Sequence, residues 1–195
     1  TLEAGSVDMV LADPPYGTTD CSWDSVIDLP SMWRELKRVI KPNGAIVLFS
    51  AQPFTSALVM SNPEWFRYEW IWCKDQGRNF QLVKHQPLKI TESILVFYLK
   101  TAMYAPQGLV RLRKSITKNN AGKGGNLGHL GSEEKRATYL QEFANYPVNI
   151  IECNSERGLH PTQKPVDLLS YLIRTYTNKG DTVLDFCMGS GSTLV

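Results

Sequence analysis

The chain has 195 residues, of which 43% are hydrophobic and 21% are charged, a composition that can build a sizeable core and that excludes general disorder. The formal net charge of +2 is close to neutral and by itself indicates no class of partner. The four cysteines are widely spaced and no apolar run is long enough to span a bilayer, so we expect a cytoplasmic protein without disulfides, metal site or membrane anchor.

Apolar runs and helical periodicities alternate along the first third of the chain. Residues 7–12 form a short apolar run that predicts a buried strand, and residues 45–50 predict another. Between them, apolar residues recur at spacings of four, three and four, which predicts a helix over 30–40. A shorter helix is predicted over 53–61.

The remaining elements complete an alternating pattern. Residues 66–74 and 91–99 are rich in aromatic and β-branched side chains and predict two strands, which we expect to pair antiparallel at one sheet edge because no helix separates them. A helix is predicted over 166–176 and a last strand over 182–186. The alternation of helices with buried strands predicts an α/β protein with a three-layer, mostly parallel sheet.

Residues 101–150 have a different composition. Five glycines between residues 122 and 131 break any regular period, and the one element predicted in the segment is a short helix over 132–143. Between residues 101 and 140, seven lysines and arginines stand against two glutamates. This excess of positive charge suits a surface that contacts phosphates, although charge alone fits a solvated loop better. We interpret the segment as an insertion within a single domain that spans residues 1–195.

A glycine-rich turn follows the last predicted strand. The strand ends in Asp185-Phe186, and residues 189–193 read GSGST. Glycines at 189 and 191 permit a positive φ and a close approach of a ligand to the backbone, while N–H groups at the start of a helix favour a carboxylate or phosphate. A lone Gly-x-Gly also occurs in ordinary strand-to-helix turns, and the turn lacks the Lys of a phosphate-binding P-loop, so ATP is not favoured.

A second motif, residues 13–16 (DPPY), follows the first predicted strand. The amine of adenine or cytosine is a poor nucleophile because its lone pair is delocalised into the ring. The Asp13 carboxylate and the Pro14 carbonyl could accept hydrogen bonds from its two N–H groups, with the prolines holding that carbonyl rigidly. Tyr16 could stack on the base. The alternative is a Pro-Pro turn with Tyr16 packed in the core.

Taken together and in this order, the motifs point to one family. Residues 13–17 (DPPYG) resemble the catalytic motif of amino-methylating DNA methyltransferases, and residues 185–186 with 189–193 resemble their cofactor motif. Residues 160–165 (HPTQKP) look like the segment that completes the cofactor pocket, and residues 92–97 look like a strand of the family. A catalytic motif that precedes the cofactor motif is the circularly permuted order of the family's β group.

This resemblance implies a Rossmann-like methyltransferase sheet, circularly permuted, with S-adenosyl-L-methionine as cofactor and double-stranded DNA as substrate. It implies direct methyl transfer to the exocyclic amine of a base turned out of the duplex. Adenine N6 is favoured because Asp leads the tetrapeptide, as is usual in the N6-adenine enzymes. Cytosine N4 methylation, an inactive DNA-binding fragment, and methylation of RNA or of a protein amide stay open, as does a partner endonuclease in a restriction-modification system.

The resemblance also assigns roles to individual residues. The catalytic residues would be Asp13, Pro14, Pro15 and Tyr16. The cofactor would lie against Asp185, Phe186, Gly189, Gly191, Ser192 and Thr193, with its methionine end closed by Pro161, Thr162 and Lys164. Lys164 would be free to meet a carboxylate. The segment 101–150 stands where the group carries its target-recognition region, and the DNA contacts expected there are Arg111, Arg113, Lys114, Lys118 and Lys123. No metal is implied.

The chain departs from the family in two places. The family has an acidic residue for the cofactor ribose on the strand after the glycine-rich helix, and this sequence ends at Val195, before such a strand. It also begins at Thr1 in what reads as a turn. We therefore expect an incomplete methyltransferase sheet, truncated at both ends. Thr91 stands where the family usually has a His.

Overall fold

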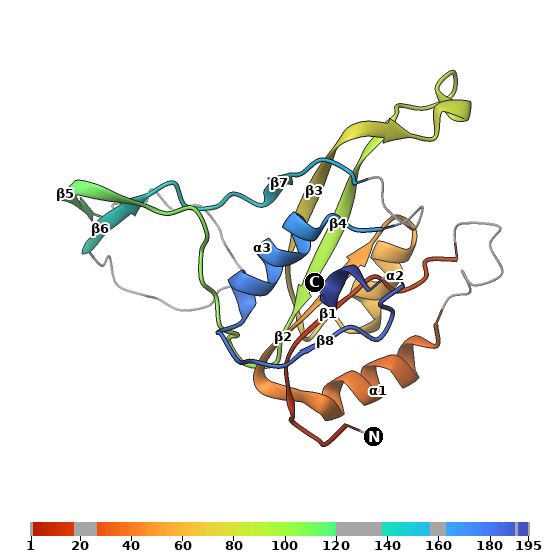
Figure 1. Ribbon diagram of the computed structural model, residues 1–195, viewed down its shortest axis with the longest axis horizontal. Coiled ribbons are helices and arrows are strands. Elements are labelled where there is room, and N and C mark those ends of the chain that lie inside the picture. The colour runs from red at the N-terminus through yellow and green to blue at the C-terminus, as the bar shows by residue number, and fades with distance from the viewer. Residues whose placement is uncertain (1, 18–26, 120–137, 157–162, 190, 195) are drawn as a thin grey trace. The chain divides into compact units, whose positions relative to one another are not determined.

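The computed structural model describes residues 2–17, 27–119, 138–156, 163–189 and 191–194 (Figure 1). The chain divides into two compact units, a larger unit of residues 1–105 and 148–195 and a smaller unit of residues 106–147. In the part of the chain that the structure describes, no helix has the length and apolar character needed to cross a membrane.

The larger unit contains every helix and strand predicted outside residues 101–150. Its strands are β1 (Val7–Ala12), β2 (Ile40–Ser50), β3 (Phe66–Arg78), β4 (Lys89–Phe97), β7 (Ile150–Glu152) and β8 (Val183–Leu184). Its helices are α1 (Leu29–Val39), α2 (Phe54–Ser61), α3 (Val166–Tyr176) and two short 3-10 helices, η1 (Phe80–Leu82) and η2 (Ser192–Leu194). Strands β2 and β3 are longer than predicted, β8 is shorter, and β7 was not predicted.

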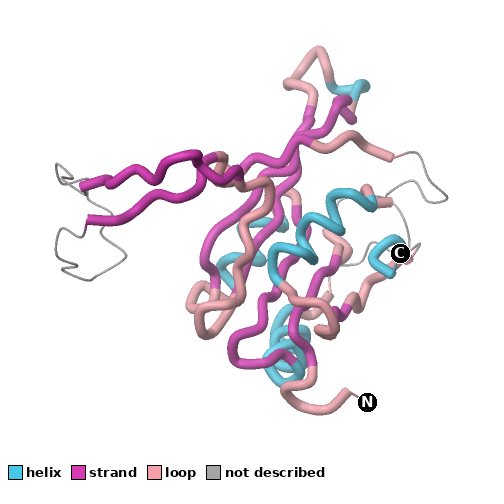
Figure 2. The backbone as a smooth tube through the Cα atoms, turned by 60° about the vertical axis from the view of Figure 1, so that its left-hand side comes forward, coloured by secondary structure: helices cyan, strands magenta, loops and turns pink. Residues whose placement is uncertain are grey.

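These strands form one mixed sheet with the order β7-β3-β4-β2-β1-β8. Strand β1 runs parallel to β2 and β8, and β3 runs parallel to β7. Strand β4 pairs antiparallel with both β2 and β3, so among the described strands of this sheet it alone runs the other way. The predicted β3–β4 hairpin is therefore present, and its strands reach beyond the sheet with η1 near their tip (Figure 2). It does not lie at the sheet edge, however, because β7 pairs along β3.

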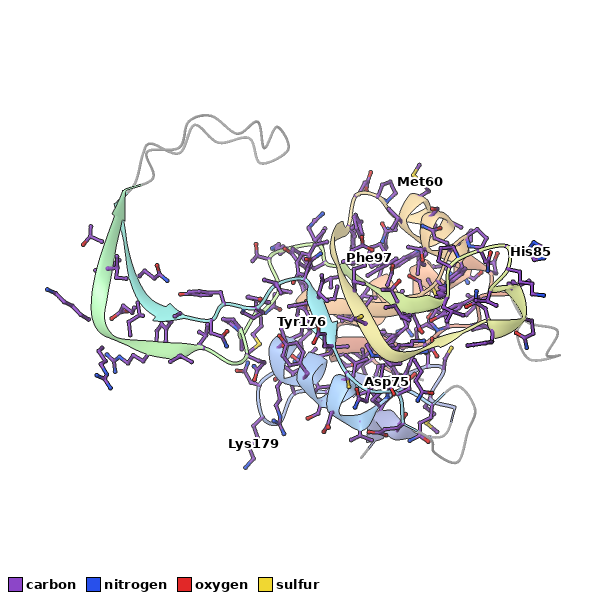
Figure 3. All side chains as sticks on the ribbon, turned by 90° about the horizontal axis from the view of Figure 1, so that it is seen from above. Met60, Asp75, His85, Phe97, Tyr176 and Lys179 are labelled. Atoms are coloured by element: carbon purple, nitrogen blue, oxygen red, sulfur yellow. The ribbon has the colours of Figure 1, made fainter. Side chains whose placement is uncertain are left out.

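Helices cover both faces of this sheet, which gives the predicted three layers. Along β2, Ile46 and Leu48 pack in a core with α1 and α2, whereas Val47 and Phe49 pack in a second core with α3. This alternation follows from the two-residue period of a strand. Because both faces of β2 are covered, residues of both alternating sets are apolar, and the apolar run of residues 45–49 is continuous. Seen from above, α3 with the labelled Tyr176 lies on one side of the strands, and α2 lies on the other (Figure 3).

The start and the buried face of helix α1, which connects β1 to β2, are determined by its local sequence. The Asp28 side chain accepts a hydrogen bond from the Ser31 N–H at 3.0 Å and caps the helix, and Pro30 suits its first turn. Trp33 and Leu36 lie on its buried face. The helix returns the chain directly into β2, so β1, α1 and β2 form a parallel crossover unit.

The smaller unit contains β5 (Val110–Asn119) and β6 (Thr138–Ala144), which pair antiparallel. The helix predicted over 132–143 is wrong for residues 138–143, which lie in β6, and residues 132–137 lie outside the described part. Pairing with β5, a partner distant in sequence, outweighs the weak local preference for a helix. The boundaries of the unit, 106 and 147, fall inside the segment interpreted as an insertion.

The core on the α3 face provides a test of this packing. Leu172 on α3 is fully buried, whereas Leu99 is 52% exposed. Replacing Leu172 with Ala removes buried methyl groups and leaves a cavity, so we expect the free energy of unfolding to fall by about 2–5 kcal/mol. The matched change Leu99→Ala should cost less than about 1 kcal/mol. Urea unfolding followed by circular dichroism measures both, and equal losses would contradict the assigned layer.

Candidate functional site

The sheet topology brings the two sequence motifs together. Strand β1 pairs parallel with β8, with Val10 opposite Leu184. Residues 13–16 follow the end of β1, and residues 185–191 follow the end of β8. Because the carboxyl ends of parallel strands lie at the same edge of a sheet, the two motifs leave it side by side, in the position where open α/β sheets bind ligands.

The reversed strand β4 adds a third contribution at this edge. Since β4 is antiparallel to β2, its beginning lies beside the end of β2, with Ser93 opposite Ser50. Glu92 precedes Ser93 and lies opposite Trp72 of β3. The next residue of β3 on the same face of the sheet is Lys74.

Four charged side chains and a tyrosine make up what we call the carboxylate–lysine cluster: Asp13, Tyr16, Lys74, Glu92 and Lys164. The Lys164 Nζ lies 2.6 Å from Asp13 Oδ2 and 2.9 Å from Glu92 Oε1. The Lys74 Nζ lies 2.6 Å from Glu92 Oε2. The Tyr16 hydroxyl lies 2.5 Å from Asp13 Oδ1 and 2.9 Å from Glu92 Oε1, so its one proton is shared between two carboxylates. Two carboxylates and two ammonium groups leave the cluster with no formal net charge.

The cluster is shielded from solvent. The side chains of Glu92 and Lys164 are 8% and 11% exposed, and that of Asp13 is 27% exposed. Burial alone would raise the pKa of Glu92, but the ammonium groups of Lys164 and Lys74 outweigh it, so the pKa of Glu92 is lowered. Burial would lower the pKa of Lys164, but Asp13 and Glu92 raise it. Both groups therefore stay charged at neutral pH.

Asp13 and Tyr16 respond differently. Burial raises the pKa of the Asp13 carboxyl, Lys164 opposes this, and the charge of Glu92 adds to it, so that the net shift is upward. Asp13 is thus the carboxyl of the cluster that takes up a proton more readily. Burial and the two neighbouring carboxylates raise the pKa of Tyr16 well above its usual value, so its hydroxyl stays neutral and donates.

The rings around the cluster hold its members in place. Tyr16 stacks on Phe54, the first residue of α2, with ring centroids 5.4 Å apart and planes 24° apart. The Lys164 Nζ lies 5.0 Å from the centroid of the Phe49 ring, a cation–π distance. Tyr16 is half-buried and packs against both cores, while Pro14 is buried. The tetrapeptide is therefore rigidly seated at the end of β1.

The glycine-rich turn is tied together by Asp185. Its Oδ1 accepts a hydrogen bond from the Cys187 N–H at 2.9 Å, and its Oδ2 accepts one from the Thr193 hydroxyl at 2.6 Å. Gly189 has a φ of +49° and Gly191 has a φ of +77°, values that disfavour any residue with a side chain. Both glycines thus adopt the positive φ that the sequence analysis expects of this turn.

The other predicted site residues fall into three groups. Phe186 packs, half-buried, against the core beneath α1 and α2, and Ser192 lies in η2. Lys164 is near the tetrapeptide, with Asp13 and Glu92 as its carboxylate partners. Pro161, Thr162 and Lys123 lie outside the described residues.

The predicted DNA contacts in the described part lie on β5 of the smaller unit. Arg111, Arg113 and Lys114 are exposed there, and the backbone of Lys118 continues the same strand.

Sequence reasoning missed Glu92 and Lys74. A signal was available: Glu92 stands two and four residues before Ile94 and Val96, so the two-residue period of a strand places it on the same, core-facing side. A buried carboxylate requires partners. Its partners could not be named, because Lys74 and Lys164 come from elements whose register with β4 is set by tertiary pairing.

Comparison with known proteins finds relatives among DNA methyltransferases, including the following two. The chain is 30% identical, over 98% of its length, to the Type II methyltransferase M.HpaI of Haemophilus parainfluenzae, and it spans 60% of that protein. It is 27% identical, again over 98% of its length, to the DNA adenine methyltransferase YhdJ of Escherichia coli (strain K12), and it spans 68% of YhdJ.

Solved structures of DNA methyltransferases share the fold, among them the following two. The M1.HpyAVI–SAM complex matches 96% of this chain and 75% of its own with a TM-score of 0.58 and 24% identity. The PvuII DNA methyltransferase (cytosine-N4-specific) matches 99% of this chain and 71% of its own with a TM-score of 0.63 and 14% identity. Both likenesses confirm the Rossmann-like methyltransferase sheet predicted from the sequence. A family model described as DNA methylase also matches residues 7–195. The chain therefore belongs to the N6/N4 DNA methylase family.

Proposed function

We propose that this chain is the catalytic part of an S-adenosyl-L-methionine-dependent DNA methyltransferase that acts on an exocyclic base amine, adenine N6 in the first place. The observation that supports the proposal is the parallel pairing of β1 with β8, because residues 13–16 and the glycine-rich turn follow the neighbouring ends of these two strands. Family membership and the likeness to a protein solved with S-adenosylmethionine support the choice of cofactor.

The glycine turn fits the proposed cofactor. A side chain at Gly189 or Gly191 would be strained at these positive φ values. Among the described residues, and apart from the chain neighbours of Gly189, the nearest atom that a Cβ at Gly189 would meet is the Cys187 carbonyl oxygen at 4.0 Å. The residues that would hold the cofactor are Asp185, Phe186, Gly189, Gly191, Ser192 and Thr193, with Pro161 and Thr162 at its methionine end. When bound, it supplies an electrophilic methyl group on a sulfonium.

The tetrapeptide prepares the amine. Each carboxylate oxygen of Asp13 has two lone pairs, and Tyr16 and Lys164 take one on each oxygen, so each keeps one for an N–H of the base. The Pro14 carbonyl, fixed by the ring of Pro15 and by its own burial, is the second acceptor. Two acceptors draw the nitrogen lone pair out of the ring. The positive charge that grows on the nitrogen is then stabilised by the Asp13 carboxylate.

The choice of adenine rests on two observations. Asp leads the tetrapeptide, as in the N6-adenine enzymes that it resembles, and the relative YhdJ is named as a DNA adenine methyltransferase. The likeness to the cytosine-N4-specific PvuII enzyme concerns the fold alone, at 14% identity. Protein from the complete reading frame that contains this chain should be incubated with DNA and S-adenosylmethionine, and the nucleosides analysed by mass spectrometry. N6-methyladenine supports the proposal, N4-methylcytosine changes the base, and no methylated nucleoside overturns it.

The catalytic role of Asp13 gives the first functional prediction. Asp13→Ala removes one of the two acceptors for the amine, so kcat should fall at least about 10²-fold. Binding of S-adenosylmethionine, measured by calorimetry, should be largely kept. Glu64→Ala, an exposed carboxylate outside the site, is the matched control and should keep full activity. Turnover retained by Asp13→Ala would remove Asp13 from the chemistry.

The DNA contacts proposed for the smaller unit give the second functional prediction. Replacing Arg111, Arg113 and Lys114 together by Ala removes up to three phosphate contacts, so DNA binding should weaken at low salt. The slope of log K against log salt should become shallower by up to about 2.7. Changing Arg111 and Arg113 to Lys keeps the charge and should keep the slope. Fluorescence anisotropy with a labelled duplex measures both, and an unchanged slope for the triple variant would identify β5 as a plain surface strand.

A further inference from the structure

Glu92 is a buried carboxylate that belongs to neither sequence motif. Its side chain is 8% exposed, and both of its oxygens are occupied, Oε1 by Lys164 and Tyr16 and Oε2 by Lys74. Burying such a group is costly, and well-packed apolar residues in its place are often neutral or stabilising. Stability alone therefore does not explain why a carboxylate is buried at residue 92.

The role of Glu92 follows from the two hydrogen-bonding partners that it has in common with Asp13. The Lys164 ammonium lies between the two carboxylates, 2.6 Å from one and 2.9 Å from the other, and the Tyr16 hydroxyl also lies between them. Without the charge of Glu92, Lys164 and Tyr16 would both turn fully to Asp13. The cluster would then carry a net positive charge around the acceptor that the base amine requires.

We propose that Glu92, acting through Lys164 and Tyr16, is a positioning residue that keeps the Asp13 carboxylate available as an acceptor, and that Lys164 is the counter-ion of this pair of carboxylates. The catalytic consequence of this inference rests on the proposed function. The arrangement of charges around Asp13 does not. Lys74 completes the arrangement, because it balances the charge of Glu92 from the side away from Asp13.

The two partners of Asp13 should act on it in opposite directions. Glu92 raises the pKa of the Asp13 carboxyl by charge repulsion, and Lys164 lowers it by attraction and by a hydrogen bond. Other groups also face Asp13: Tyr16 from its own loop, and Cys187 after β8, where burial and the charges of Asp185 and Asp13 raise the pKa of the thiol to about 11. These groups are the same in every variant compared below.

The test compares Glu92→Gln, Lys164→Met and the double variant in protein from the complete reading frame. Carboxyl ¹³C NMR follows the Asp13 titration, with Asp13→Asn to assign its signal. The titration should move to lower pH in Glu92→Gln and to higher pH in Lys164→Met. In the double variant, which loses one charge of each sign, it should return toward the wild-type position. Shifts of the same sign, or no shift in either single variant, would overturn the inference, and this readout requires no activity.

Kinetics then separate the inference from the proposed function. In an active wild type, the acid limb of the kcat profile reports the ionisation of Asp13 and should move as the titration does. Glu92→Gln should lower kcat with little change in KM for S-adenosylmethionine, and Glu64→Gln should change neither. An inactive wild type whose Asp13 titration still shifts as stated would overturn the methyltransferase proposal and leave the charge arrangement standing. A variant that does not fold, judged by its circular dichroism, is replaced by Glu92→Met or Lys164→Gln, which remove the same charges and whose titration shifts should have the same signs.

Discussion

The placement of β1 between two parallel neighbours is the constraint on which the site depends. Parallel pairing with β2 and β8 puts three carboxyl ends at one edge of the sheet. Strand β1 is buried along nearly its whole length, so the tetrapeptide that follows it starts from a fixed point. The single reversal, at β4, delivers a strand beginning to the same edge and with it Glu92. One mixed sheet thereby gathers groups from residues 13, 74, 92, 164 and 185, which no local segment could bring together.

Charge neutrality makes this gathering possible. An isolated carboxylate or ammonium is too costly to bury, but two of each in mutual contact compensate one another and satisfy most of their hydrogen bonds. The cluster contributes little net stability on this account, and apolar residues of similar volume would pack as well. What it contributes is a carboxylate, Asp13, that is largely buried and still 27% exposed. The strong electrostatics that a site requires are obtained by balancing charge within it.

Elements set by local pattern could be predicted from the sequence, and elements set by distant pairing could not. The apolar stripe of α3 and the capped start of α1 are local signals, and both helices begin and end within a residue or so of the prediction. Strand β7 has three residues and exists because the edge of β3 offers it hydrogen bonds, while β6 depends on β5. The same division holds at the site. Residues 13–16 and 185–193 can be recognised as motifs in the sequence. The place of Glu92 in the site, by contrast, follows from the register of β4, which sets Glu92 opposite Trp72 and Ser93 opposite Ser50.

The partners of Lys164 in the structure are set by the fold and not by its own motif. An ammonium in that segment is expected to meet a carboxylate, and in the structure it meets two, from Asp13 and Glu92. If Lys164 left them for a carboxylate of the cofactor, two buried anions would lose their shared counter-ion, which is the more costly arrangement. Its attachment to Asp13 is therefore the stable one. It also joins the segment before α3, which in the resemblance closes the cofactor pocket, to the group that would hold the amine.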